Sequence, residues 1–252
     1  MAWSFLDVET PFGFAHRGGN GPAPENTLAA FARATELGYR YLETDVHRTA
    51  DGVLVAFHDD GLERVAGLPG RISDYDWDRL SEVRLDGEHS IPRLVDLLET
   101  FPDARFNIDP KADDAVDPLI QIIRDFNALP RVCIGSFSEG RIGRVRAALG
   151  AELCTSPGPL GVVKVLIAAI LGLPWTPPYG CLQIPTANYG VPFDSAWLIG
   201  RVKRLGIQVH FWTINDEAEM HRLFDRGADA LITDEIELLN QVLRERGAPP
   251  GG

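Results

Sequence analysis

The stretch FGFAHRGGNGPAPENTLAAFARATELGYRYLETDV, residues 12–46, decides the fold class. It begins with a short apolar run at 12–15 and ends with a strand-like run at 39–46. Between these runs, residues 28–37 carry apolar side chains at helical spacing, and Gly38 follows as a helix stop. The stretch therefore predicts a strand, a helix and a second strand.

Strand-like and helix-like segments go on alternating along the chain. Further strands are expected at residues 105–108, 132–134, 152–154, 181–184, 207–212 and 230–232, with helices between them and an additional strand-like run at 53–57. Crossover connections of this kind over 252 residues favour an α/β fold of the TIM (β/α)₈ barrel type over a doubly wound sheet. No GxGxxG run follows the first strand, which weakens the dinucleotide-binding alternative.

We expect a single domain over residues 1–252, because no break in composition divides the chain. Residues 59–92 are long for a loop, so they are expected to form a small excursion on the barrel rim after the second strand–helix region. The tail at 247–252 is expected to be disordered.

One segment, PLGVVKVLIAAILGLPW at residues 159–175, is almost wholly apolar, with Lys164 as its only charge. It is short and interrupted for a spanning helix, so we expect a helix that is buried or packed on the rim. A lipid-contacting lip is the less favoured alternative. The N-terminus shows no basic region followed by an apolar stretch, which favours a cytoplasmic location.

The net charge of −12, from 24 basic and 36 acidic residues, argues against a nucleic-acid or anionic-membrane partner. An anionic substrate would then need strong local positive charge, which a bound divalent metal can supply. Cys133, Cys154 and Cys181 are odd in number and lack a CxxC spacing, so we expect reduced, buried thiols. The sequence leaves the oligomeric state open.

Polar side chains lie at the end of several expected strands or directly after them, where the active site of a TIM barrel forms. These residues are His16, Arg17, Glu43, Asp45, His58, Asp109 and Lys111. One rim would thus gather two imidazoles, three carboxylates and two cations. That set is suited to metal-assisted hydrolysis of a phosphate ester.

Each residue type has a place in such chemistry. Glu43 and Asp45 are two apart on a strand, so both point the same way, and oxygen ligands of this kind suit Mg²⁺ or Ca²⁺. Asp109 could supply the third oxygen. The histidines at 16 and 58 can exchange protons near neutral pH, while the cations at 17 and 111 can bind phosphate.

The runs AHRGGNGPAPENTLAAF, ETDVHRTADGVLVAFHDD, NIDPK, VHFWTIND and GADALITD resemble the glycerophosphodiester phosphodiesterase family. The resemblance extends over residues 12–239, nearly the whole chain. It implies a TIM barrel that uses a divalent metal to hydrolyse glycerophosphodiesters to glycerol 3-phosphate and an alcohol.

Residue by residue, the resemblance implies a general acid/base pair of His16 and His58 and a metal site that includes Glu43 and Asp45. The third ligand of that site matches Asp109, where the family usually has a glutamate with a side chain one methylene longer. Trp212 matches a tryptophan expected to contact substrate. Glu25, in the PENT run, is expected either to support the metal site or to act at the helix start.

Two other functions stay open from the sequence. A lysophospholipase D would use the same site on a substrate with one acyl chain, and the apolar segment at 159–175 could line a groove for it. A non-catalytic phosphodiester-binding barrel is disfavoured because both histidines and all the acids are present. The nucleophile can be water or the glycerol 2-hydroxyl, and the order in which the two histidines act is also open.

Overall fold

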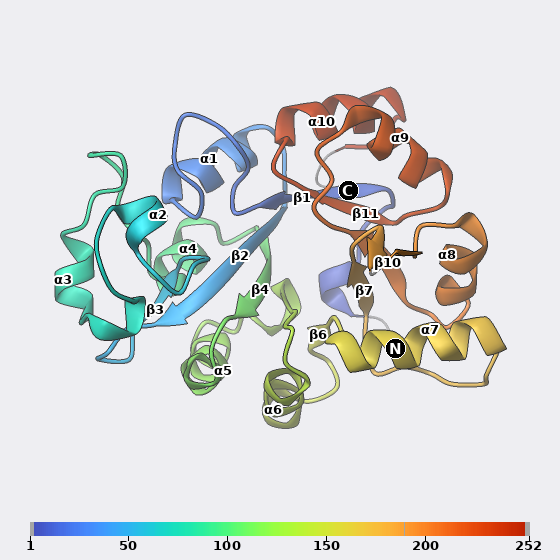
Figure 1. Cartoon of the computed structure of the whole chain (residues 1–252), viewed down its shortest axis with the longest axis horizontal. Coiled ribbons are helices and arrows are strands. Elements are labelled where there is room, and N and C mark those ends of the chain that lie inside the picture. Colours follow the sequence, from blue (N-terminus) through green and yellow to red (C-terminus); the bar gives the residue numbers. More distant parts are fainter. Residues whose placement is uncertain (1–2, 189, 250–252) are drawn as a thin grey trace.

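The computed structural model describes residues 3–188 and 190–249. Eight parallel strands form a nearly closed barrel surrounded by helices (Figure 1). The strands are β1 (Phe12–His16), β2 (Tyr41–Arg48), β4 (Arg105–Pro110), β5 (Val132–Ile134), β6 (Cys154–Thr155), β7 (Cys181–Ile184), β10 (Gln208–Phe211) and β11 (Ala230–Thr233). This architecture confirms the TIM barrel that the alternating pattern predicts.

The strands follow one another around the barrel in the order β6-β5-β4-β2-β1-β11-β10-β7. The barrel is incomplete between β6 and β7, which share no ladder in the described part of the chain. A backbone hydrogen bond from Gly180 N–H to the carbonyl of Thr155, at 3.1 Å, joins them at that point. All eight carboxyl ends therefore face one rim.

The outer layer consists of helices whose apolar faces cover the strands. These helices are α1 (Leu28–Glu36), α4 (Leu94–Thr100), α5 (Val116–Asp125), α6 (Glu139–Leu149), α7 (Pro159–Leu171), α8 (Ala196–Lys203), α9 (Glu217–Asp225) and α10 (Ile236–Glu245). Local signals set their ends: the Thr27 side chain accepts a hydrogen bond from Ala30 N–H at 3.2 Å and so caps α1. Gly172, at φ 68°, ends α7 four residues before the expected segment does.

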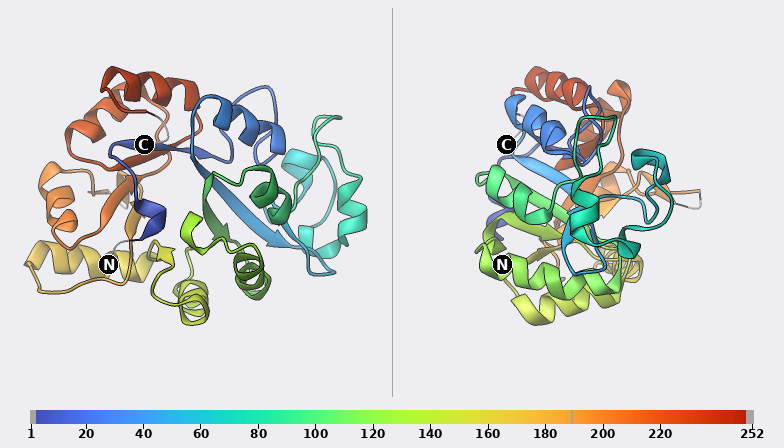
Figure 2. Two further views of the ribbon diagram at one scale, coloured as in Figure 1. Left: turned by 180° about the vertical axis from the view of Figure 1, so that it is seen from behind. Right: turned by 90° about the vertical axis from the view of Figure 1, so that its left-hand side faces the viewer.

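The lower half of the barrel interior is filled by Phe12, Phe14 and Tyr41 together with the three cysteines. The cysteines are buried and free, as the sequence predicts. The N-terminal segment lies across this end of the barrel, as the view from behind shows (Figure 2), and the Tyr41 hydroxyl donates to the carbonyl of Phe5 at 2.7 Å. Side chains therefore plug the bottom and leave the functional space at the opposite rim.

The additional strand-like run becomes β3 (Leu54–Ala56), which pairs antiparallel with the end of β2 and so extends the sheet beyond the barrel. Behind it, α2 (Glu63–Ala66), the 3₁₀ turn η2 (Ile72–Asp74) and α3 (Trp77–Ser81) enclose a small apolar cluster of their own (Figure 1, cyan). Of the tail at 247–252, residues 250–252 lie outside the described part of the chain.

A short hairpin of β8 (Ala187–Asn188) and β9 (Val191–Pro192) rises from the rim between β7 and α8. Next to α8 lies α7, along the outer edge of the barrel (Figure 1, yellow). Within the described residues, none of the helices combines the length and apolar character that crossing a membrane requires.

Candidate active site

A cavity of about 710 Å³ opens at the carboxyl ends of the barrel strands. Its polar residues come mainly from the ends of β1, β2 and β4 and from the loop after β3. From these places come His16, Arg17, Glu43, Asp45, His58, Asn107, Asp109 and Lys111, which include all the charged and histidine residues of the lining. The remaining lining, from the loops after β5 and β6, from α7 and from the segments after β7 and β10, is mostly apolar.

The end of β1 places His16 and Arg17 in the cavity. The backbone N–H of Arg17 donates to the carbonyl of Glu43 at 3.0 Å, which ties the turn to β2. The His16 Nδ1 lies 2.6 Å from the Asp234 Oδ1, and its Nε2 lies 3.7 Å from the Glu43 Oε2. Burial alone would lower the pKa of His16, but the charges of Glu43 and Asp234 outweigh it, so that pKa lies above its usual value.

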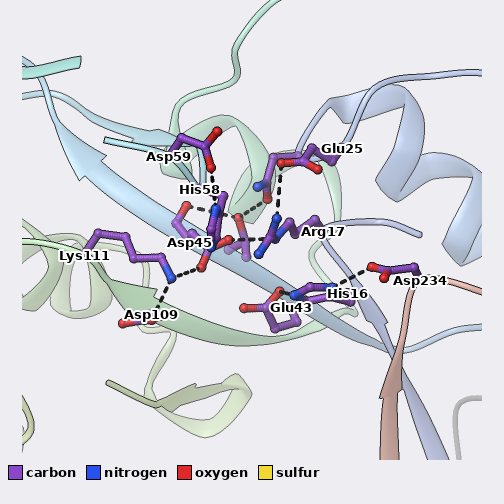
Figure 3. A network of polar contacts seen from close by, with 12 residues as sticks. His16, Arg17, Glu25, Glu43, Asp45, His58, Asp59, Asp109, Lys111 and Asp234 are labelled. Atoms are coloured by element: carbon purple, nitrogen blue, oxygen red, sulfur yellow. Dashed lines mark hydrogen bonds and ion pairs between the residues drawn. The ribbon is translucent and has the colours of Figure 1, made fainter. Parts of the chain in front are cut away.

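Both acids of β2 point into the barrel side by side. Burial, reinforced by the charge of Asp45, raises the pKa of Glu43 to about 7. Asp45 lies between two cations: its Oδ1 is 2.6 Å from the Lys111 Nζ and its Oδ2 is 3.1 Å from the Arg17 Nε (Figure 3). Such closely spaced carboxylates are stable only with positive charge nearby.

Strand register brings the third acid to the same place. Asp109 on β4 is the ladder partner of Asp45, and its Oδ2 accepts a hydrogen bond from Lys111 Nζ at 2.9 Å. Burial raises the pKa of Asp109. The pKa of Lys111 is also raised, because the two aspartates outweigh the effect of burial. Lys111 therefore remains a cation between two carboxylates.

The carboxylates fit a bound cation. The Glu43 Oε2, the Asp45 Oδ2 and the Asp109 Oδ1 are all buried and accept no hydrogen bond within the described part of the chain, and of these only the Asp45 Oδ2 has an Arg or Lys nitrogen beside it, the Arg17 Nε. A buried carboxylate oxygen without a donor is costly unless a cation neutralises it. The oxygen-only donor set is the type that Mg²⁺ and Ca²⁺ prefer.

Strand β3 runs antiparallel to β2, and the loop that follows β3 places His58 at the rim. Its Nδ1 lies 2.6 Å from the Asp59 Oδ1, and its carbonyl oxygen is 3.1 Å from the Nε2 of His47. Asp59 also accepts a hydrogen bond from Arg64 Nε at 2.5 Å. Hydrogen bonds from Arg64 and then from His58 hold the pKa of Asp59 down to about 2. A charged carboxylate thus backs this histidine.

Glu25 and Trp212 are the remaining residues singled out from the sequence. Glu25 does not line the cavity; it contacts Arg17 Nη1 at 3.3 Å (Figure 3). It also contacts Arg64 Nη2 at 2.6 Å and so bridges the two arginines. Trp212 follows β10 and lines the apolar side, where its ring meets that of Phe137 edge to face at 5.9 Å between centroids. The other expected site residues all line the one cavity.

Sequence reasoning did not single out several residues of this site. Asp234, at the end of β11, backs His16, and Asp59 backs His58 in the same way. Asn107 lies on the same face of β4 as Asp109, and its Oδ1 accepts a hydrogen bond from Gln183 Nε2 at 3.1 Å. The period-two alternation of the strand could have indicated Asn107. Asp234 also sits at the end of an apolar strand run, which is the signal that identified the other acids.

The model of the glycerophosphoryl diester phosphodiesterase family matches residues 16–144 and 175–238. A relative from Mycobacterium tuberculosis, named probable glycerophosphodiester phosphodiesterase 2, is 40% identical over 92% of this chain and 90% of its own. The human protein named lysophospholipase D GDPD1 is 28% identical over 93% of this chain and 86% of its own.

A solved structure has the same fold. The phosphodiesterase of Oleispira antarctica, in complex with the product sn-glycerol-3-phosphate, superposes with a TM-score of 0.76 at 23% identity, over 93% of this chain and 97% of that chain. The family model begins at His16, the last residue of β1, and covers the whole of β2 with its paired acids. The chain therefore belongs to the glycerophosphoryl diester phosphodiesterase family and is an enzyme that hydrolyses phosphodiesters.

Proposed function

We propose that the chain hydrolyses glycerophosphodiesters to glycerol 3-phosphate and an alcohol, with a divalent metal, Mg²⁺ or Ca²⁺, held by Glu43, Asp45 and Asp109. The observation that carries the proposal is the group of three buried carboxylates, each with an oxygen that lacks a hydrogen-bond donor within residues 3–188 and 190–249. The metal, when bound, would neutralise negative charge on the phosphate oxygens.

Two cations of the chain are proposed to bind the phosphate. Arg17 and Lys111 both line the cavity and supply positive charge beside the three carboxylates, in a chain of net charge −12. The planar guanidinium of Arg17 can donate two parallel hydrogen bonds, and Lys111 supplies a compact charge. Glu25 holds Arg17 from behind and so limits the directions its guanidinium can take.

The two histidines are proposed to move the protons. In each, Nδ1 faces a carboxylate, Asp234 for His16 and Asp59 for His58. This contact fixes the proton on Nδ1 and leaves Nε2 available to the cavity. One histidine would take the proton of the nucleophile and the other would protonate the departing alkoxide, each contributing about 10²–10⁴-fold.

A turnover assay of the metal-stripped protein tests this proposal. Activity against glycerophosphocholine is expected to disappear on metal removal and to return with Mg²⁺ or Ca²⁺. Full activity without metal would refute the role of the carboxylates. Replacement of either His16 or His58 by Ala is expected to lower the rate by at least about 10²-fold while the far-ultraviolet circular dichroism stays unchanged. A cyclic glycerophosphate observed during turnover would identify the glycerol 2-hydroxyl as the nucleophile.

A second candidate is lysophospholipase D activity at the same site. The apolar side of the cavity favours it, because Leu160, Val163 and Phe193 line a wall that a glycerol-and-choline substrate does not need. A protein bearing that name is among the relatives. Comparison of kcat/KM for glycerophosphocholine and lysophosphatidylcholine distinguishes the two activities, since only the second substrate carries an acyl chain.

A further inference from the structure

Large apolar side chains are exposed in one part of the molecule. Within the described residues they are Phe137, Leu160, Val163, Ile167, Ile170, Leu171, Leu173, Val191 and Trp197. Six of these nine belong to α7 and the turn directly after it, so the exposure is not scattered over the surface. A contiguous exposed apolar surface of this kind indicates an interaction site.

Apart from Lys164, the helix α7 is apolar all around its circumference. One face is buried against the barrel through residues such as Val165 and Ala169. The other face carries side chains that are roughly half to two-thirds exposed, from 48% for Ile167 to 67% for Leu160. A helix that is apolar all round is normally buried on every side or lies in lipid, and α7 is covered on one side only.

The exposed face continues into the cavity. Leu160 and Val163 line the cavity wall and are themselves 67% and 51% exposed, so apolar surface runs from the wall onto the outer face of α7. The match to the family model stops at residue 144 and resumes at 175, so the whole of α7 lies outside the matched segments. The exposed apolar face therefore lies outside the matched segments, which carry the acids and histidines.

We propose that the α7 surface, made by Leu160, Val163, Ile167, Ile170, Leu171 and Leu173, docks on a zwitterionic lipid surface and brings the cavity mouth to acyl-chain substrates in it. A protein partner on this surface would cover Leu160 and Val163 and close the mouth, whereas a fluid lipid surface delivers substrate there. The docking rests on the geometry of α7 alone; its use for catalysis rests on the proposed lysophospholipase D activity.

The charges favour a zwitterionic surface over an anionic one. Lys164 is the single charged residue in α7, and the chain as a whole carries a net charge of −12, so anionic lipid would repel it. Trp197 on the adjacent helix α8 is 60% exposed, and tryptophan side chains favour the boundary between lipid and water. With 13 residues, α7 is too short to cross a bilayer and would lie in its surface.

The test is co-sedimentation of the inactive His16→Ala protein with phosphatidylcholine vesicles, which measures docking without turnover. The double variant Ile167→Glu/Leu171→Glu changes two exposed side chains that do not line the cavity. Its partition coefficient is expected to fall by at least about tenfold, because burying one such side chain is worth about that factor. The control Thr100→Glu/Ala151→Glu adds the same charge at exposed positions outside the α7 surface, at the end of α4 and after α6, and is expected to bind as the parent does.

Activity separates this inference from the proposed function. In the otherwise wild-type chain, Ile167→Glu/Leu171→Glu is expected to hydrolyse dissolved glycerophosphocholine at an unchanged rate and to lose turnover of lysophosphatidylcholine held in vesicles. Equal vesicle binding by the double variant and its parent would overturn the docking surface. Failure of the parent to bind vesicles would also overturn it. This includes the case in which ultracentrifugation shows that the parent is a dimer and that the double variant is a monomer. If the wild-type chain binds vesicles but hydrolyses neither substrate, the catalytic proposal is refuted and the docking surface is not.

Discussion

Removal of the Asp234 carboxylate tests how the active site holds His16. The contact between the Asp234 Oδ1 and the His16 Nδ1 is 2.6 Å long and joins residues 218 positions apart in the sequence. A hydrogen bond to a charged group contributes about 1.5–3 kcal/mol. If that energy is fully used in the transition state, Asp234→Ala should lower kcat/KM by about 10- to 150-fold.

The same variant should shift the pH profile in a known direction. The negative charge of Asp234 is one of the causes that raise the pKa of His16, so its loss lowers that pKa. The kinetic inflection that reports His16 should therefore move to lower pH, whether His16 serves as the acid or as the base. Asp234→Asn, which removes the charge and keeps an oxygen acceptor, should show the same shift with a smaller loss of rate.

The assay is the pH dependence of kcat/KM for glycerophosphocholine, with metal at saturation. Asp225→Asn is the matched control, because Asp225 is an exposed partner of Arg246 on the outside of the barrel. An Asp234→Ala protein with wild-type kcat/KM and an unmoved inflection would refute the positioning role. A loss of rate with no shift in the inflection would show that Asp234 acts on the fold rather than on His16.

Three further predictions follow from single contacts. Lys111→Ala should lower kcat/KM by about 10- to 150-fold, since it removes a charged hydrogen-bond donor to the phosphate; an unchanged value at saturating metal would contradict that role. Asp59→Asn should lower the free energy of unfolding at pH 7 by roughly 1 kcal/mol, because the ion pair lies near the surface. The folded pKa of Asp59, about 2, lies below its usual value of 3.8, so its stabilisation is present above pH 3.8 and disappears as the pH falls through 2. Urea titrations of Asp59→Asn and the parent at pH 7 and at pH 2 would show this, and an equal loss of unfolding free energy at the two pH values would contradict it. Gly18→Ala should cost about 2–4 kcal/mol in urea unfolding, because φ there is 89° and an added Cβ would lie 2.7 Å from the Ala30 Cβ; a wild-type midpoint would contradict this.

Local sequence patterns determined most of the barrel and most of the candidate site. Apolar periodicity and helix stops predicted the order of strands and helices, because these signals act within one element. Polar residues at the end of strand-like runs or directly after them identified Glu43, Asp45 and Asp109, since parallel strands expose their carboxyl ends on the same rim. The site residues on β1, β2 and β4 could therefore be named without the structure.

Only the tertiary structure decided which elements pair, in which direction, and which side chains they bring into contact. The antiparallel direction of β3, which turns His58 back to the rim, depends on pairing with β2 rather than on its own residues. The contact of Asp234 with His16 depends on β11 closing against β1. The exposure of one face of α7 depends on what packs around it, whereas its apolar sequence predicts burial equally well on either side. Sequence patterns encode the conformation of each segment and the face it offers, but pairing direction and burial arise from contacts between segments far apart in the chain.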